Sequence, residues 1–174
     1  MKKLSLDQLN RISTEAFKAQ PKTPIVLVLD DIRSGMNVGS AFRTADAFAL
    51  QGIYLCGYTA QPPHREILKT ALGATESVDW QYFDDVGKAV ANLKSAGFSV
   101  WAVEQTDRSI LLPDFEWNAS KPIALVFGNE VDGVSEEALA LVNGAIEVPQ
   151  FGTKHSLNIS VCLGIVVWDL FRRQ

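Results

Sequence analysis

Residues 145–160 read AIEVPQFGTKHSLNIS, a short strand-like run that passes through Pro149 and a loop of small residues into an apolar helix. The helix is predicted over residues 157–172 and is apolar enough to be buried. Its start nevertheless carries hydroxyl and amide side chains at Ser156, Asn158 and Ser160. Such groups, with the free backbone N–H groups beside them, can bind a ligand or can simply cap the helix. Both interpretations of Ser156 are open at this point.

Upstream of this segment, short apolar runs alternate with segments of helical periodicity. The predicted strands cover residues 25–29, 53–56, 78–83, 100–103, 123–127 and 145–148, and the other predicted helices cover residues 38–48, 66–72, 86–95 and 136–142. Strands that are apolar on both faces and alternate with helices predict an α/β domain, with a parallel sheet covered on both sides. Residues 105–122 are expected to form an irregular surface excursion.

Length and composition indicate one globular domain of ordinary type. The chain has 174 residues, of which 47% are hydrophobic and 21% are charged. Residues 4–20 show helical spacing of apolar side chains before Pro21 and Pro24, which predicts an N-terminal helical extension over residues 1–23 and a main domain over residues 24–174. The first residues lack the apolar core of a secretory signal, and no apolar stretch is long enough for a membrane span, so we expect a cytoplasmic protein without a membrane partner.

The cysteine content and the net charge argue against three features: a disulfide framework, a metal site and a surface that is basic throughout. Cys56 and Cys162 are far apart in the sequence, and with only two histidines the chain offers neither a disulfide framework nor a metal site. The formal net charge of -4 argues against a surface that is basic throughout. Contact with a nucleic acid therefore requires a local basic patch.

Two loops that follow predicted strands carry unusual residues. In residues 30–46, Asn37 is a candidate N-cap, and the next helix places Arg43 on the same face as Gly39, where a ligand could approach. The alternative is a closely packed helix start with a solvated arginine. In residues 128–135, glycines at both ends allow close approach to a ligand, and Glu130 could bind a cation, a sugar hydroxyl or Arg43. The alternative is a tight turn in which Ser135 caps the next helix.

The third such loop is residues 148–158. Ligands of parallel sheets gather beyond the carboxyl ends of the strands, so all three loops are expected at one edge of the sheet. His155 lies in this loop, but no spacing to a nucleophile supports a role as a general base, and it is interpreted as a surface or lining residue.

Together the three loops resemble the three motifs of the SpoU-type, or TrmH-like, RNA ribose 2′-O-methyltransferases of the SPOUT superfamily. The matching segments are residues 37–45, residues 127–133 and residues 148–161, and residues 69–74 resemble a further segment common in the family. The resemblance covers residues from about 24 to 172, in order and at compatible spacing. It implies an α/β domain with a C-terminal deep trefoil knot, a topology that the general rule against knots would exclude.

The resemblance also implies a function and its residues. S-adenosyl-L-methionine is the implied cofactor, RNA (tRNA or rRNA) is the implied substrate, and a homodimer is the implied assembly, with no metal. The motif-one arginine corresponds to Arg43, which would act as a proton acceptor with help from an RNA phosphate, because guanidinium is otherwise always protonated. The residues that would orient Arg43 and the ribose are Asn37, Glu130, Ser156 and Asn158. The residues that would hold the cofactor, largely through their backbone, are Val103, Gly128, Val148, Ser156 and Leu157.

The resemblance also suggests which residues would contact RNA and which other functions must be considered. A local groove for RNA could be lined by Arg33, Arg43, Arg65, Lys69 and Lys154, with further basic residues of the extension at Lys2, Lys3, Arg11 and Lys18. One rival is a non-catalytic knotted RNA-binding or ribosome-assembly protein, against which the intact motif residues argue. A Rossmann-type dehydrogenase is the other rival, and it lacks G-x-G-x-x-G after the first strand. The apolar C-terminal helix belongs to either the subunit core or the dimer interface.

Overall fold

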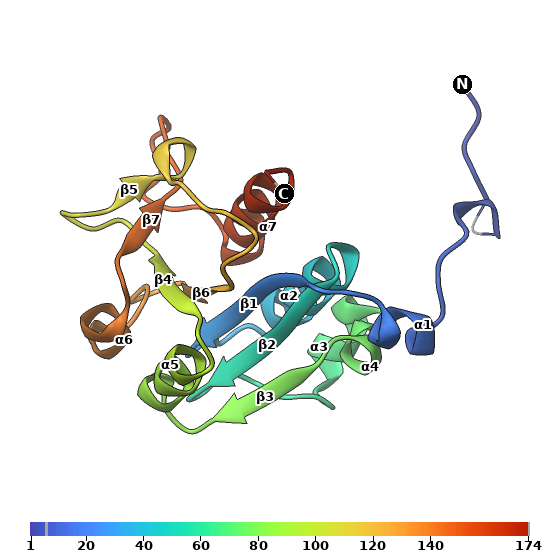
Figure 1. Ribbon diagram of the computed structural model, residues 1–174, viewed down its shortest axis with the longest axis horizontal. Coiled ribbons are helices and arrows are strands. Elements are labelled where there is room, and N and C mark those ends of the chain that lie inside the picture. Colours follow the sequence, from blue (N-terminus) through green and yellow to red (C-terminus); the bar gives the residue numbers. More distant parts are fainter. Residues whose placement is uncertain (6, 174) are drawn as a thin grey trace.

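The protein is an α/β domain built on one parallel sheet (Figure 1), and the computed structural model describes residues 1–5 and 7–173. The sheet has seven strands in the order β3-β2-β1-β6-β4-β7-β5, and every pairing is parallel. The strands are β1 (Thr23–Asp30), β2 (Leu50–Cys56), β3 (Trp80–Phe83), β4 (Ser99–Val103), β5 (Ile110–Leu111), β6 (Ile123–Phe127) and β7 (Ala145–Glu147). The predicted α/β class with a parallel sheet is confirmed.

Helices cover both faces of this sheet. The helices are α1 (Thr14–Ala19), α2 (Gly35–Ala47), α3 (Arg65–Ala71), α4 (Ala74–Ser77), α5 (Val86–Ser95), α6 (Glu136–Leu141) and α7 (Ile159–Phe171), with short 3₁₀ turns η1 (Asp7–Leu9) and η2 (Leu112–Asp114). Two separate core clusters explain this arrangement: one contains buried residues of α2, α3 and α7, and the other contains buried residues of α5 and α6. Strand β1 contributes to both core clusters, because its side chains alternate between the two faces of the sheet. Ile25, Leu27 and Leu29 pack into the first cluster, and Val26 and Val28 pack into the second.

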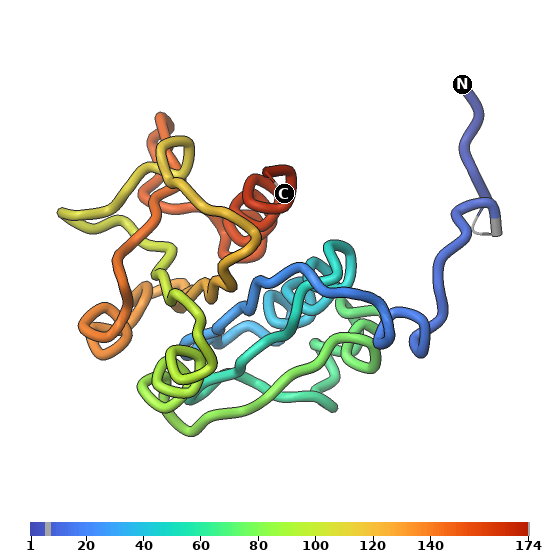
Figure 2. The backbone as a smooth tube through the Cα atoms, viewed as in Figure 1, coloured from blue at the N-terminus to red at the C-terminus, as the bar shows by residue number. Residues whose placement is uncertain are grey.

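The N-terminal extension is less helical than the sequence predicts. Its one α-helix is α1, which begins after the N-cap Ser13, and Phe17 of this helix is buried in the core. Before it, Asn10 adopts a left-handed backbone conformation, and Leu9 and Ile12 remain exposed, so the helix predicted over residues 4–20 is confirmed only over Thr14–Ala19 and is wrong before Ser13. Leu6, which contributed to that pattern, lies outside the described residues. Figure 2 shows the first residues running away from the body of the domain.

The predicted surface excursion over residues 105–122 is anchored to the core. It contains β5, which pairs with β7, and the turn η2. Leu112 and Phe115 are buried, and the Phe115 ring packs edge-on against Trp101 of β4. The alternation of apolar residues here is too short to predict a strand, which is why the sequence does not reveal it.

The C-terminal segment lies beside a part of the domain that is distant in sequence, and the Gln105 amide donates to the His155 carbonyl oxygen there. In Figure 2 the chain of residues 148–171, coloured orange to red, passes beside the green-yellow segment of residues 104–122 before it forms α7. The trefoil knot implied by the family resemblance stays a prediction. Among the residues that the structure describes, no helix is long and apolar enough to cross a membrane, and no group of three or more potential metal ligands gathers.

Candidate functional site

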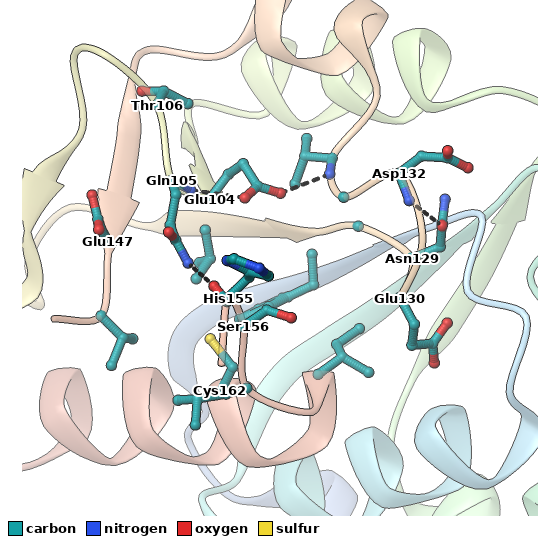
Figure 3. Close-up of a pocket in the computed structure, with 18 of the residues that line it drawn as sticks. Glu104, Gln105, Thr106, Asn129, Glu130, Asp132, Glu147, His155, Ser156 and Cys162 are labelled. Carbon is teal, nitrogen blue, oxygen red and sulfur yellow. Dashed lines mark hydrogen bonds between the residues drawn. The ribbon is translucent and has the colours of Figure 1, made fainter. Parts of the chain in front are cut away.

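A cavity of about 690 Å³ lies beyond the carboxyl ends of three adjacent strands, β6, β4 and β7. This is the edge of a parallel sheet where ligands bind, and the volume is in the usual range for a small-molecule site. Figure 3 shows the loops that follow these strands, together with the start of α7, surrounding the cavity. The five residues that the resemblance implies for the cofactor all line it: Val103, Gly128, Val148, Ser156 and Leu157.

The loop after β6 is a compact turn that requires glycine at both ends. Its ends are joined by backbone hydrogen bonds of 3.1 Å in both directions between Asn129 and Gly133. A Cβ added to Gly128 would lie 1.9 Å from the carbonyl carbon of Gly133, so only glycine permits this approach. The Asn129 side-chain oxygen accepts the backbone N–H groups of Val131 and Asp132, each at 2.9 Å. Ser135 caps α6 as expected, and Glu130 projects from the turn with its carboxylate free to bond outside the loop.

The loop before α7 ends two residues further along than the sequence predicts. Asn158, not Ser156, is the N-cap, because its side-chain oxygen accepts the backbone N–H of Ser160 at 2.9 Å. Helix α7 therefore begins at Ile159, and the predicted helix start at residue 157 is corrected. Ser156 does not cap the helix, and it lines the cavity instead. His155 also lines it, in agreement with its interpretation as a lining residue.

The loop after β1 also caps its helix differently from the prediction. Ser34 is the N-cap of α2, since its hydroxyl accepts the backbone N–H of Asn37 at 3.3 Å, and Asn37 lies within the first turn. Gly39 provides no approach for a ligand. It is buried against α3, where an added Cβ would lie 2.0 Å from the Thr70 hydroxyl and 2.5 Å from the Ile67 carbonyl oxygen. Contact between helices α2 and α3 therefore explains this glycine.

A chain of side-chain hydrogen bonds connects all three loops. The Asn37 amide donates to Glu130 Oε1 at 2.5 Å, and the Asn158 amide donates to Asn37 Oδ1 at 3.4 Å. Glu130 and Asn158 line the cavity, and Asn37 joins them from α2. Each of these three residues could be explained by its own turn or helix start, but the structure brings all three together at the edge of the cavity. One interpretation of the sequence paired Glu130 with Arg43, but in the structure Glu130 is hydrogen-bonded to Asn37.

Arg43 lies apart from the cavity. It is exposed on α2, it is not among the residues that line the cavity, and within the described chain no hydrogen bond or ion pair connects it to Asn37, Glu130, Ser156 or Asn158. Arg33 forms an exposed ion pair of 3.3 Å with Asp132 at the edge of the cavity. The single subunit thus assembles four of the five proposed reaction residues and leaves the arginine on its surface.

The lining of the cavity is rich in carboxylates. Its acidic residues are Glu104, Glu130, Asp132, Glu136 and Glu147, and its apolar residues include Val103, Leu139 and Ile146. Cys162 lines the cavity from α7, and burial together with the nearby Glu104 charge raises the pKa of its thiol to about 11. A cavity of this kind favours a ligand that is cationic and partly apolar, and its thiol is protonated near neutral pH.

Sequence reasoning missed part of the cavity lining, including two polar residues that bond to the surrounding loops. Glu104 and Gln105 follow β4 directly and line the cavity. The rule that ligands gather at the carboxyl ends of strands points to them, but only after β4 is known to lie between β6 and β7 in the sheet.

Comparison with known proteins adds independent information. Residues 24–168 match the model of the SpoU rRNA Methylase family. A tRNA (guanosine(18)-2′-O)-methyltransferase of Thermus thermophilus is 32% identical over 94% of this chain and 81% of its own length. A 23S rRNA (guanosine-2′-O-)-methyltransferase of Vibrio parahaemolyticus is 29% identical over 96% of this chain and 66% of its own length.

The fold has a close structural counterpart as well. The crystal structure of an AdoMet-bound rRNA methyltransferase from Sinorhizobium meliloti superposes with a TM-score of 0.81 at 27% identity, over 88% of this chain and 57% of that one. The chain therefore spans little more than half of that protein. The family match covers most of the chain, including all three loops around the cavity. The protein therefore belongs to the SpoU rRNA methylase family.

Proposed function

We propose that the protein transfers a methyl group from S-adenosyl-L-methionine to a ribose 2′-hydroxyl of RNA. The observation that carries the proposal is the hydrogen-bonded chain from Asn158 through Asn37 to Glu130. It brings the three motif loops together at the edge of the cavity beyond β6, β4 and β7. Family membership and the activities named for the Thermus and Vibrio relatives support the same function.

The residues of the cavity fit S-adenosyl-L-methionine. Apolar walls suit its adenine ring, and the close turn at Gly128 and Gly133 forms one edge of the cavity. The carboxylates of the lining favour its positively charged sulfonium and ammonium groups. When bound, the cofactor supplies an activated methyl group, and the reaction requires no metal. Backbone groups near Val103, Gly128, Val148 and Leu157, with the Ser156 hydroxyl, are the proposed contacts.

The protein's own residues must position the ribose and assist removal of the hydroxyl proton. A hydroxyl is a weak nucleophile near neutral pH, so its orientation toward the methyl group contributes much of the rate. We assign this orientation to Asn37, Glu130, Ser156 and Asn158. Arg43 is the proposed proton acceptor, acting with an RNA phosphate because a lone guanidinium is always protonated.

We propose a homodimer, which would explain why Arg43 lies apart from the cavity of its own subunit. Helix α7 carries an exposed apolar stripe of Val161, Ile165 and Trp168, whose side chains are spaced for one helix face and are 51%, 39% and 53% exposed. We propose that this stripe packs against a second copy and that Arg43 of one subunit acts beside the cofactor of the other. A surface-disrupting variant, Val161→Glu, should convert the dimer to monomers in sedimentation velocity, whereas a monomeric wild type would contradict the assembly.

The proposed substrates are tRNA and rRNA, and the proposed compartment is the cytoplasm, where both RNAs function. Basic side chains that remain available on the surface include Arg43, Arg65 and Lys69, whereas Arg33 is paired with Asp132. Because phosphate contacts release counterions, RNA affinity should fall steeply as salt concentration rises.

The direct test combines cofactor binding with methyl transfer. Wild-type protein should bind S-adenosyl-L-methionine in calorimetry and transfer its labelled methyl group to unmodified tRNA or rRNA. The product should resist alkaline cleavage at one nucleotide, because a 2′-O-methyl group cannot attack the neighbouring phosphate. Cofactor binding without transfer to any cellular RNA would favour the non-catalytic RNA-binding alternative. Absence of cofactor binding would contradict the proposed function itself.

A further inference from the structure

Two neighbouring side chains at the end of β4 reach opposite walls of the cavity (Figure 3). Glu104 Oε2 accepts the backbone N–H of Val134 at 3.0 Å, on the side of the loop after β6. The Gln105 side-chain amide donates to the carbonyl oxygen of His155 at 2.7 Å, on the side of the loop before α7. Glu104 Oε1 also accepts the backbone N–H of Gln105 at 2.8 Å. One dipeptide is therefore bonded to both loops between which the cavity opens.

The contact of Glu104 is steric as well as polar. A Cβ added to Gly133 would lie 2.3 Å from Glu104 Oε2, and Gly133 has a φ of +71°, so the carboxylate occupies space that only glycine leaves open. The backbone of Gly133 in turn fills the space beside Gly128. The position of the Glu104 carboxylate thus determines where the Gly128 edge of the cavity lies.

The Gln105 contact holds a segment that has few other anchors. Phe151 in the loop before α7 is 97% exposed, and residues 151–158 are all exposed. A single hydrogen bond to such a loop contributes little to the stability of the fold, because water competes for both partners. Its main effect is on where the loop rests relative to β4.

We propose that Glu104 and Gln105 are positioning residues, a clasp that sets the spacing of the two loops and thereby the affinity of the cavity for S-adenosyl-L-methionine. This role rests on the proposed function. A ligand that binds between two loops must order them, and loops that are already held in place reduce that cost. Loss of the clasp should therefore raise the KM for the cofactor and leave kcat at saturating cofactor nearly unchanged.

Two explanations of a role for Glu104 can be told apart: the length of its side chain, which lets it contact the loop after β6, and its negative charge, which could attract the sulfonium. If the clasp acts through reach, Glu104→Gln keeps the length and one acceptor oxygen and retains more affinity than Glu104→Asp, which is one methylene shorter. The loss should then be equal for S-adenosyl-L-methionine and for S-adenosyl-L-homocysteine, whose sulfur is uncharged. If Glu104 instead attracts the sulfonium, Asp substitutes for Glu, Gln does not, and only the charged ligand loses affinity.

Calorimetry with these two ligands tests the proposal. Glu104→Asp and Gln105→Ala should each bind both ligands roughly tenfold more weakly, because each releases a loop that the ligand must then order. Glu104→Gln should lose less, and the control Asp107→Ala, whose side chain is 88% exposed outside the cavity, should bind as wild type does. Wild-type affinity in Glu104→Asp, or a loss confined to the charged ligand, would overturn the clasp.

Amide hydrogen exchange without ligand provides a readout that does not depend on the proposed function. Glu104→Asp should accelerate exchange in residues 128–134, and Gln105→Ala in residues 149–158, with exchange in β1 and β6 unchanged. If wild type binds neither ligand, the proposed function fails and the exchange pattern alone decides the clasp. Unchanged exchange in both loops would show that Glu104 and Gln105 do not position them.

Discussion

Asn37 donates a side-chain hydrogen bond to Glu130 across 2.5 Å, which connects helix α2 to the loop after β6. Asn37 also accepts a bond from Asn158 at the start of α7, so one amide joins partners that are 93 and 121 positions away in the chain. An amide can do this because it presents a donor and an acceptor on the same side chain. Neither aspartate nor leucine, which are close to asparagine in size, has both functions.

Replacement of Asn37 by Asp should impair the reaction more than cofactor binding. The substitution keeps the size of the side chain but removes the donor and places a carboxylate against Glu130, so the two groups repel each other. We expect kcat to fall roughly 10–100-fold, because misplaced reaction groups are costly, with little change in cofactor affinity measured by calorimetry. Ser40→Ala, on the next turn of α2, is the control. An unchanged kcat would show that the Asn37 bridge has no role in the reaction.

Arg43→Ala should abolish methyl transfer and leave cofactor binding nearly intact. The side chain is exposed and lies outside the cavity lining, so its loss leaves the cofactor contacts in place. Arg43→Lys keeps the charge but not the planar, five-donor fork, and it should restore little activity. The measurement is labelled methyl transfer beside calorimetry of the same preparations. Turnover retained in Arg43→Ala would eliminate the proposed role.

Mixed dimers test whether Arg43 acts on the cofactor of the other subunit. Ser156→Trp should fill the cavity and block the cofactor, and it should be inactive as a homodimer, as Arg43→Ala is. A heterodimer of the two variants combines one intact cavity with one intact arginine. If the arginine acts across the interface, co-purified heterodimers should recover about half of the activity of wild type, since one of two composite sites is whole. If it acts within its own subunit, they should remain inactive.

Gly39 is expected to be a stability residue rather than a ligand contact. Gly39→Ala places a methyl group within 2.5 Å of the Ile67 carbonyl oxygen, and backbone cannot move aside as a flexible side chain can. Overpacking of this kind typically costs about 1–3 kcal/mol. The free energy of unfolding from urea titration should fall by that amount, and Ser40→Ala should stay within about 0.5 kcal/mol of wild type. A drop in activity without a drop in stability would contradict this explanation and would indicate that Gly39 contacts a ligand.

The sequence predicts most of the fold because its signals are local. Strands such as residues 123–127 are uninterrupted apolar runs, and their predicted bounds match the structure. Helix starts are less well predicted, since several residues near each start can cap. Ser34 rather than Asn37, and Asn158 rather than Ser156, take that role because of the backbone angles around them. The predicted N-terminal helix is confirmed only over Thr14–Ala19, where Phe17 reaches the core, because Leu9 and Ile12 before it stay exposed and find no core to pack against.

The site is predictable only in part because its key relations are tertiary. That Asn37 meets Glu130 follows from the resemblance and not from spacing. That Gly39 meets α3 contradicts a local interpretation that was reasonable for a glycine one turn before an arginine. Glu104 and Gln105 are ordinary residues in sequence, and they gain a role only from the placement of β4 between β6 and β7.

Asp30→Asn should stabilise the protein more as the pH rises. The Asp30 carboxyl is 3% exposed at the end of β1, and burial raises its pKa above the ordinary 3.8, although the backbone N–H of Ser135 donates to it at 2.9 Å. At pH values between the unfolded and folded pKa, the native state retains a proton that the unfolded state has lost, so the wild-type contribution to stability is complete below pH 3.8 and declines as pH rises through the folded pKa. Asparagine does not titrate and still offers an oxygen to Ser135, so in urea unfolding the variant should gain on wild type as the pH rises from about 4, close to the ordinary aspartate pKa, until the pH passes the folded pKa. Asp107→Asn, whose side chain is 88% exposed, controls for the loss of one charge, and a gain that is equal at every pH would contradict the buried-charge explanation.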